Sequence, residues 1–275
     1  MSALSSPSAA GSSAVPLAQI IDLHLRSKSL PTHGNLSNTE EDVPTVTALH
    51  KFQHQKGKKW YSDATAYWEE TENCPATVDG VLGGFAELSP PDVKGSLPFI
   101  DVLQSTFKVG NEKACDIGAG IGRVSKLVLL EKFRTVDLVE VSSRLIKAAP
   151  EYIGDPRSKD CRFMCLGMEE FDFGTAKYDV VWVQWVIGHL TDEDLITFLN
   201  RAAAGLKPNG VIVVKDNVSD AEAFWVDEDD SSVTRGREYM TKLFDLAGME
   251  IILQRESDEF PKEIFPVPMY ALRKK

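Results

Sequence analysis

The sequence predicts an α/β fold with a seven-stranded, mainly parallel sheet, helices on both of its faces and a helical lid ahead of it. Two observations carry this prediction. From residue 113 to the C-terminus, short apolar segments alternate with segments of helical periodicity. A glycine-rich stretch, 116–122, also joins the first strand directly to a helix. Strands separated by helices imply right-handed crossovers and therefore parallel neighbours.

The elements of this core follow one another in a regular order. The expected strands are β-branched or aromatic runs, at 113–117, 135–141, 161–166, 178–184, 210–215, 250–255 and 269–273. The expected helices have an apolar face, at 123–130, 143–149, 192–205 and 235–247. Ahead of this core, 109–275, the segment 60–108 predicts a lid with a short helix at 63–70, a glycine-rich turn at 79–84 and a helix from a cap at Asp92 to Phe107.

Residues 1–59 differ from the rest, and we expect a mostly disordered extension there. Residues 1–15 are rich in Ser and Ala, which is compatible with a transit peptide although arginines are few. A short helix is expected within 16–28, where four aliphatic side chains gather. The basic cluster Lys56–Lys59 has the composition of a nuclear signal, and also of an ordinary solvated surface.

Composition excludes several classes of protein. The chain has 275 residues, 43% of them hydrophobic, and a formal net charge of −11, which is unsuited to neutralising nucleic-acid phosphates. No run approaches the roughly 18–20 apolar residues of a membrane span. The four cysteines lack the spacing of a disulfide framework or zinc site, so we expect reduced thiols and no metal. We expect neither nucleic-acid nor membrane binding.

The stretch Asp116-Ile-Gly-Ala-Gly-Ile-Gly-Arg123 predicts the ligand. Its glycines let the backbone approach a bound molecule, and the helix that follows offers free N–H groups. The spacing G-x-G-x-G differs from the G-x-G-x-x-G of nicotinamide enzymes, whose pyrophosphate a preceding carboxylate would repel. Asp116, with Gly118 and Gly120 beside it, suits the ammonium and sulfonium charges of S-adenosylmethionine, so we expect it either near the ammonium group or ordering the loop. We therefore expect a Rossmann-like class I methyltransferase.

Two further positions fit the same cofactor. Glu140 ends the second expected strand, about 20 residues beyond Gly118, where an acidic side chain can accept both ribose hydroxyls. Gly167 and Met168 follow the third strand, where the adenine edge is expected, although Met168 is equally compatible with core packing. Arg123 is expected to pair with the carboxylate of the cofactor.

The ends of the fourth and fifth strands should face the reacting methyl, because ligands bind beyond the carboxyl ends of parallel strands. Gln184, Trp185 and His189 lie at the first of these ends, and Asn217 at the second. The loop that follows holds the acidic run 227–230.

Five segments then resemble the protein α-N-terminal methyltransferases, from about residue 60 to the C-terminus. They are Val78-Asp-Gly-Val-Leu-Gly-Gly84, Gly118-Ala-Gly-Ile-Gly-Arg123, Gln184-Trp-Val-Ile-Gly-His-Leu190, Lys215-Asp-Asn217 and Asp230-Ser-Ser-Val233. That family methylates the exposed α-amine of proteins that begin Xaa-Pro-Lys/Arg. The resemblance implies S-adenosylmethionine as cofactor, S-adenosylhomocysteine as product, and location in cytoplasm and nucleus. We also expect a monomer.

The resemblance also implies roles that the chemistry supports. An α-amine has a pKa of about 7.7–8.0 and is largely protonated near neutral pH, so attack needs a proton acceptor. Histidine titrates in that range, and His189 with Asp230 is the expected general base. Asn217 would hold the amine or the proline carbonyl, and Trp185 the first residue through its ring face.

The remaining acceptor residues would bind the rest of the peptide. Asp227 and Asp230 would attract the basic third residue, with Ser232 beside them. Leu82 and Gly83 would cover the peptide as a lid, with Trp68 nearby. Phe265 stands at the position of a family tyrosine, which places that hydroxyl contact in question.

Two alternatives to this function differ in class. A small-molecule amine methyltransferase would use the same loop but would have no affinity for an Xaa-Pro-Lys peptide. A binding module with a relict cofactor site would carry changes at His189, Asn217 or Asp230, and all three are present.

Overall fold

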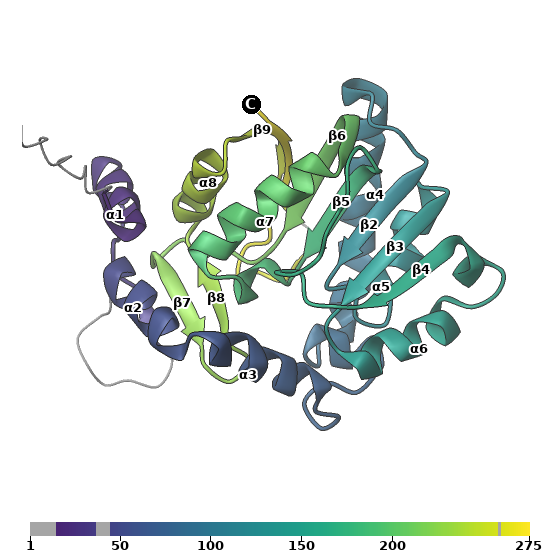
Figure 1. Ribbon diagram of the computed structural model, residues 1–275, viewed down its shortest axis with the longest axis horizontal. Helices are drawn as coiled ribbons and strands as arrows, with labels where there is room; N and C mark the ends of the chain where they lie inside the picture. Colours follow the sequence, from purple (N-terminus) through teal and green to yellow (C-terminus); the bar gives the residue numbers. More distant parts are fainter. Residues whose placement is uncertain (1–14, 37–44, 258–259) are drawn as a thin grey trace, which may run out of the picture.

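The computed structural model describes residues 15–36, 45–257 and 260–275. A seven-stranded sheet forms its centre, in the order β4-β3-β2-β5-β6-β10-β9 (Figure 1). Its strands are β2 (Lys113–Ile117), β3 (Thr135–Glu140), β4 (Cys161–Cys165), β5 (Tyr178–Gln184), β6 (Leu206–Lys215), β9 (Met249–Arg255) and β10 (Met269–Lys274). Six of these strands run in the same direction, and β10 runs opposite to them. The predicted fold class is confirmed.

Eight helices surround this sheet in the described residues. They are α1 (Leu17–Ser27), α2 (Val46–Lys56), α3 (Lys58–Glu69), α4 (Ser89–Phe107), α5 (Arg123–Leu127), α6 (Ser143–Ile153), α7 (Asp192–Ala204) and α8 (Arg237–Leu246). Among the described residues, none of these helices is both long and apolar enough to cross a membrane.

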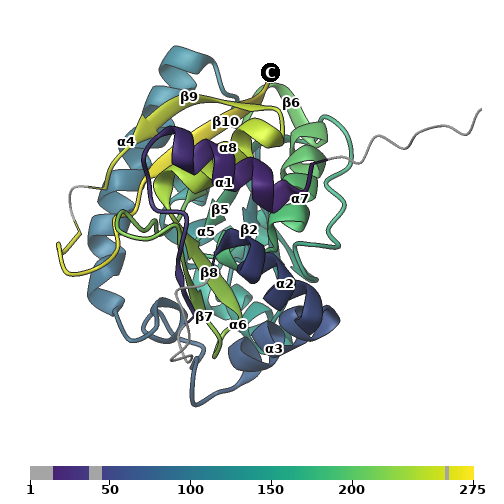
Figure 2. The same cartoon turned by 90° about the vertical axis from the view of Figure 1, so that its left-hand side faces the viewer.

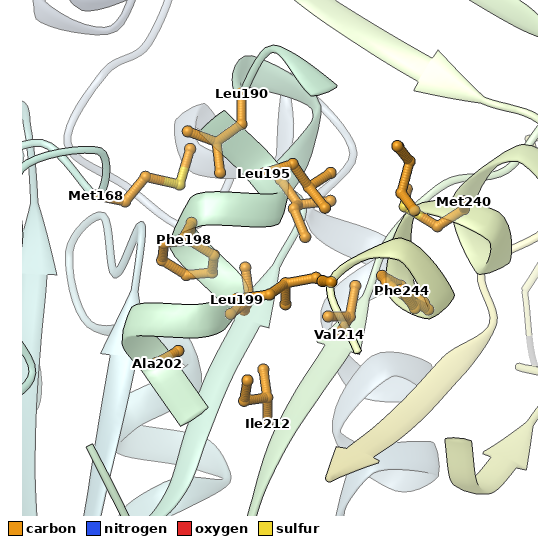
Figure 3. Close-up of a cluster of buried hydrophobic side chains, with 14 of the residues drawn as sticks. Met168, Leu190, Leu195, Phe198, Leu199, Ala202, Ile212, Val214, Met240 and Phe244 are labelled. Atoms are coloured by element: carbon orange, nitrogen blue, oxygen red, sulfur yellow. The ribbon is translucent and has the colours of Figure 1, made fainter. Parts of the chain in front are cut away.

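The two faces of the sheet carry separate cores, because successive side chains of a strand point to opposite faces. Ala114 of β2 packs with residues of α4, α5 and α6, whereas its neighbour Cys115 packs with α7 and α8. Figure 3 shows the second core: Leu195 and Leu199 of α7 lie toward β6 and α8, whereas Phe198 of the same helix lies toward Met168. The apolar pattern of both faces is therefore what the alternation of strands and helices predicts.

A small second sheet was not predicted. The strands β7 (Phe224–Asp227) and β8 (Ser232–Arg235) form an antiparallel hairpin, and β1 (Asn35–Leu36) pairs parallel with β7. Its strands are short, and the turn between β7 and β8 is acidic, so neither carries a clear strand pattern. We call the segment 224–235 the acidic hairpin.

The expected disordered extension does not hold for residues 15–36 and 45–59. The helix anticipated within 16–28 is α1, and its apolar face at Ala18, Ile21 and Leu25 is buried. Figure 2 shows α1 lying across α8. Apolar residues spaced three or four apart favour such packing over disorder. The basic cluster spans the end of α2 and the start of α3. The transit-peptide suggestion falls almost wholly on residues 1–14, outside the described residues.

Asp92 is not a helix cap. Helix α4 begins earlier, at Ser89, with prolines in its first turn, where a missing N–H costs nothing. Asp92 lies inside the helix and is fully buried. Its buried carboxylate must therefore find partners within the chain, and these lie beside the predicted ligand site.

Candidate active site

A pocket opens at the carboxyl ends of β2, β3 and β5, where the sequence places its ligand. We call it the loop pocket. Seven of the eight predicted cofactor residues line it: Gly118, Gly120, Arg123, Glu140, Gly167, Met168 and Gln184. Residues from α3 complete one wall, and they were not predicted: Tyr61, Ala64 and Thr65.

The glycine loop has a backbone that other residues would strain. Gly118, Gly120 and Gly122 all have positive φ angles, of 66°, 54° and 81°. A Cβ atom on Gly118 would also lie 2.6 Å from Cγ2 of Val186. The glycines therefore serve both the turn and its close packing against the end of β5.

Asp116, the eighth predicted residue, does not line the loop pocket. Its carboxylate is buried beneath the loop and accepts a hydrogen bond from Oγ of Ser125 at 2.7 Å. Burial raises the pKa of Asp116 to about 7, against the opposing effects of Ser125 and Arg123. The side chain points to the α5 face of the sheet because it alternates with Cys115. Of the two roles expected of Asp116, this geometry supports the ordering of the loop and not a contact with the ammonium group.

Glu140 holds the glycine loop at a fixed distance from β3. Its Oε2 accepts from the backbone N–H of Gly120 and its Oε1 from that of Ser142, both at 2.8 Å. Burial raises the pKa of this carboxyl, although the same hydrogen bonds oppose the rise. Each carboxylate oxygen has two lone pairs, so both can accept a further hydrogen bond from a ligand.

A buried polar network lies behind Arg123 and Gln184. Asp92 accepts hydrogen bonds from Nη1 of Arg123 at 2.6 Å and from Nε2 of Gln184 at 2.8 Å. Lys215 also pairs with Asp92, and burial lowers the pKa of that lysine although Asp92 opposes the shift. The network fixes two side chains of the loop pocket through α4. Sequence reasoning missed it because its members are far apart in the chain.

His189 lies at the boundary of two pockets. We call the second one the outer groove, and both pockets share Trp68, Val81, Leu82, Trp185, Val186 and His189. Nδ1 of His189 is 3.2 Å from the carbonyl of Ser231, and Nε2 accepts from the indole N–H of Trp68 at 3.1 Å. A carbonyl only accepts and an indole N–H only donates, so the proton is on Nδ1. Nε2 is therefore the basic nitrogen and faces the shared boundary.

The turn after β5 carries Trp185 in a strained conformation, with φ at 54°. Asp216, at the end of β6, holds this turn by accepting from the backbone N–H groups of Val186 and Ile187, both at 3.1 Å. Burial raises the pKa of Asp216 to about 6. The ring of Trp185 lies 5.6 Å from the guanidinium carbon of Arg123. Asp216 was not predicted as a site residue, although it adjoins Asn217.

The acidic hairpin brings one carboxylate to the outer groove. Asp230 lines the groove with Asn217 and Ser232, and its buried Oδ1 has no hydrogen-bond partner within the described chain. Burial raises the pKa of Asp230, against the effects of His189 and Ser232. Asp227 is exposed instead and accepts from the N–H of Asp229 at 2.9 Å. It does not line the groove, contrary to the expected pairing with Asp230.

The lid forms the opposite wall of the groove. Leu82 and Gly83 line it as predicted, together with Phe85, whose ring is exposed. Phe265 also lines the groove and is 38% exposed. Among the described residues, no group of three or more metal-ligating side chains is found.

Comparison with known proteins agrees with this geometry. A sequence model of the AdoMet-dependent proline di-methyltransferase family matches residues 56–273. The N-terminal Xaa-Pro-Lys N-methyltransferase 1-B of Xenopus laevis is 41% identical over 217 residues, which are 78% of this chain and 96% of that protein. The chain belongs to this family.

Two other relatives extend the comparison. The α N-terminal protein methyltransferase 1 of Oryza sativa subsp. indica is 42% identical over 79% of this chain and 72% of its own length. A S-adenosylmethionine-dependent methyltransferase structure from Leishmania major superposes with a TM-score of 0.78 at 32% identity, over 89% of this chain and 97% of that one. Like the family as a whole, the chain is a S-adenosylmethionine-dependent methyltransferase.

Proposed function

We propose that the chain transfers methyl groups from S-adenosylmethionine to the α-amino group of proteins that begin Xaa-Pro-Lys or Xaa-Pro-Arg. The observation that carries this proposal is the buried, unpaired Oδ1 of Asp230, beside His189 where the loop pocket meets the outer groove. An unpaired buried carboxylate oxygen is costly, and a cationic amine satisfies it. The names of relatives that share 40% or more of their residues support the same substrate.

The loop pocket suits S-adenosylmethionine, which supplies the methyl group when bound. Glu140 would accept the ribose hydroxyls with the lone pairs that its backbone contacts leave. Arg123 would hold the carboxylate with guanidinium nitrogens other than Nη1, which Asp92 occupies. Gly118 and Gly120 let the backbone approach the ligand, and Gly167 and Met168 would border adenine. Gln184, fixed by Asp92, would lie near the methyl. S-adenosylhomocysteine is the product.

The residues of the outer groove would prepare the amine. Asp230 binds the ammonium form, and the proton passes to Asp230 or to Nε2 of His189, which leaves a lone pair on the amine nitrogen. Trp68 donates to the same Nε2 atom in the peptide-free chain, so its indole must release that nitrogen for the proton. Asn217 would orient the peptide and Trp185 would hold its first residue. Orientation of amine and methyl then supplies much of the rate enhancement.

The peptide beyond its first residue would lie along the groove. Ser232 and Phe265 border it, and Leu82 and Gly83 cover it from the lid. Asp227 is at the exposed end of β7, so it would attract the basic third residue by long-range charge rather than from the groove wall. We also propose that the chain works as a monomer in the cytoplasm and nucleus.

The test measures release of S-adenosylhomocysteine with a peptide that begins Ser-Pro-Lys. Matched peptides carry an acetylated N-terminus or Glu at position three. We expect turnover of the first, none of the acetylated peptide and poor turnover of the Glu peptide. Turnover of small amines with none of any peptide contradicts the proposal and favours a small-molecule amine methyltransferase. Equal turnover of the Lys and Glu peptides would show that Asp227 and Asp230 do not recognise the charge of the third residue.

A further inference from the structure

We infer that the helices and strand ahead of the family match set the affinity for the peptide by holding the acidic hairpin in place. We call residues 17–36 and 46–56 (α1, β1 and α2) the N-terminal brace. The family match begins at residue 56, so almost all of the brace precedes it. The inference rests on the proposed function, since it names what fixes the peptide-binding side of that site.

The brace adds a strand to the acidic hairpin. Asn35 and Leu36 pair parallel with Trp225 and Val226 of β7, directly before Asp227. The carbonyl of His33 also accepts from the N–H of Ala223 at 2.8 Å. A hairpin of two four-residue strands is marginally stable alone, and a third strand supports it. The position of Asp230 in the turn of this hairpin therefore depends on residues about 200 positions earlier.

Gly34, directly before β1, allows β1 to lie close to β7. A Cβ atom on Gly34 would lie 2.4 Å from the carbonyl oxygen of Phe224 and 2.6 Å from its ring, well inside the van der Waals contact distance. Both neighbours belong to β7, and one of them is backbone. Any side chain at residue 34 therefore pushes β1 away from β7.

Helix α2 reaches the hairpin through a chain of buried polar contacts. Nε2 of His50 lies 2.6 Å from Oδ2 of Asp192, at the start of α7. Oδ1 of Asp192 accepts from Nε of Arg235 at 2.8 Å, and Arg235 belongs to β8. Arg235 also donates to the carbonyl of Leu190 at 2.6 Å, next to His189. The brace thus contacts β7 directly and is linked to β8 and to the residue after the predicted base through Asp192 and Arg235.

A second path leads to His189 itself. The ring of Phe52 in α2 packs edge-on against Trp60, with centroids 6.2 Å apart. The indole N–H of Trp60 donates to the carbonyl of His189 at 2.7 Å. Lys56, at the end of α2, also lies 3.8 Å from Glu228 in the hairpin turn.

The brace lines neither pocket, because the first lining residue along the chain is Tyr61 of α3. Its effect must therefore pass through the hairpin and the turn at His189. Within residues 15–36, 45–257 and 260–275, no hydrogen bond or ion pair joins the brace to Glu140, Arg123 or the glycine loop. The brace should consequently govern peptide binding and leave binding of the cofactor product unchanged.

The experiment compares Gly34→Ala with Gly95→Ala in the full chain. Gly95 lies in α4, where an added Cβ meets only Met269 at 3.9 Å. We expect Gly34→Ala to raise the KM for a Ser-Pro-Lys peptide by about tenfold, which is about 1.4 kcal/mol of binding free energy. The Kd for S-adenosylhomocysteine should stay within twofold. Hydrogen exchange of the amides of residues 223–227 should accelerate in Gly34→Ala and not in Gly95→Ala.

A second pair of variants tests the polar path. His50→Leu removes the contact to Asp192, whereas His54→Leu changes an exposed histidine on the same helix. We expect a higher peptide KM only for His50→Leu, and partial rescue by His50→Gln, whose amide can still donate.

The outcomes separate the two proposals. If the peptide KM and the hydrogen exchange are unchanged in both Gly34→Ala and His50→Leu, the inference about the brace is wrong. The proposed function still stands in that case, provided that the wild-type chain methylates the peptide. A wild-type chain that does not methylate the peptide contradicts the proposed function. In that case exchange at residues 223–227 alone decides whether the brace holds the hairpin. An equal loss of affinity for S-adenosylhomocysteine in Gly34→Ala also overturns the inference.

Discussion

The loop pocket and the outer groove meet at His189, yet they differ in how their charges are paired. In the loop pocket, both oxygens of Glu140 accept backbone hydrogen bonds and Arg123 pairs with Asp92. In the groove, Oδ1 of Asp230 is buried without a hydrogen-bond partner among the described residues, and Trp185 is held at a positive φ. The first site is complete before any ligand binds, whereas the second is left for a ligand to complete.

This difference indicates where substrate recognition and catalysis reside. A preorganised pocket binds its ligand with little rearrangement, and its residues fix position. An unpaired buried charge favours a ligand of opposite charge. In the proposed mechanism that ligand is the ammonium group, from which a proton must also be removed. Variants in the groove should therefore change turnover, and variants behind the loop pocket should change stability.

The largest effect is expected for Asp230→Asn. The amide cannot neutralise the ammonium or accept its proton, so kcat/KM for a Ser-Pro-Lys peptide should fall by about 10²- to 10⁴-fold. The Kd for S-adenosylhomocysteine, measured by calorimetry, should not change. Asp229→Asn, an exposed neighbour in the same turn, is the control. A parallel loss of product affinity in Asp230→Asn would show that the two sites are not separable.

The next largest effect is expected on stability, from a variant that leaves a buried charge unpaired behind the loop pocket. Asp92→Ala leaves Lys215 buried without its carboxylate, and breaking a buried ion pair costs about 3–5 kcal/mol. Chemical denaturation should show this loss in the free energy of unfolding. Asp101→Ala breaks an exposed pair with Lys132 and should cost no more than about 1 kcal/mol. Equal stability of these two variants would contradict the role given to the buried network.

The pH dependence of turnover tests the groove carboxylate directly. Burial raises the pKa of Asp230. In the proposed mechanism, the ionised form of this carboxyl is the one that binds the amine. The kcat/KM should therefore fall as pH decreases through this raised pKa, by about tenfold for each further pH unit. The fall should begin above the pH expected for an exposed aspartate. Asp230→Asn should lose this acidic limb, and its persistence in that variant would assign the limb to another group.

The smallest effect is expected for Phe265→Tyr, which adds the hydroxyl that the resemblance to the family predicts at this position of the groove lining. One neutral hydrogen bond contributes about 0.5–1.5 kcal/mol. The KM for the peptide should fall by about two- to tenfold while kcat changes little. A rise in KM would show that the groove is shaped around the phenylalanine ring.

Much of the fold follows from the sequence because its patterns are local. Each strand and helix of the core has its own periodic pattern of apolar residues, and the glycines at 118 and 120 indicate a turn. Glu140 could be placed because it ends a strand next to that turn. In each case one segment contains the whole signal.

The remaining features depend on contacts between distant segments. Asp116 adjoins the loop in sequence, but its side chain points beneath it, and a sheet covered on both faces shows no alternation that would reveal this. Asp92 looks like a cap because its partners Arg123 and Lys215 lie far along the chain. The pairing of β1 with β7 is equally hidden, since neither strand has a clear pattern.

The most direct test of the account is where the methyl groups are added. A Ser-Pro-Lys peptide is incubated with the full chain and S-adenosylmethionine, and the product is fragmented by mass spectrometry. We expect one or more added methyl groups on the fragment that carries the N-terminal amine, and none on the lysine side chain. Methylation of the lysine side chain, or an unmodified peptide, would contradict it.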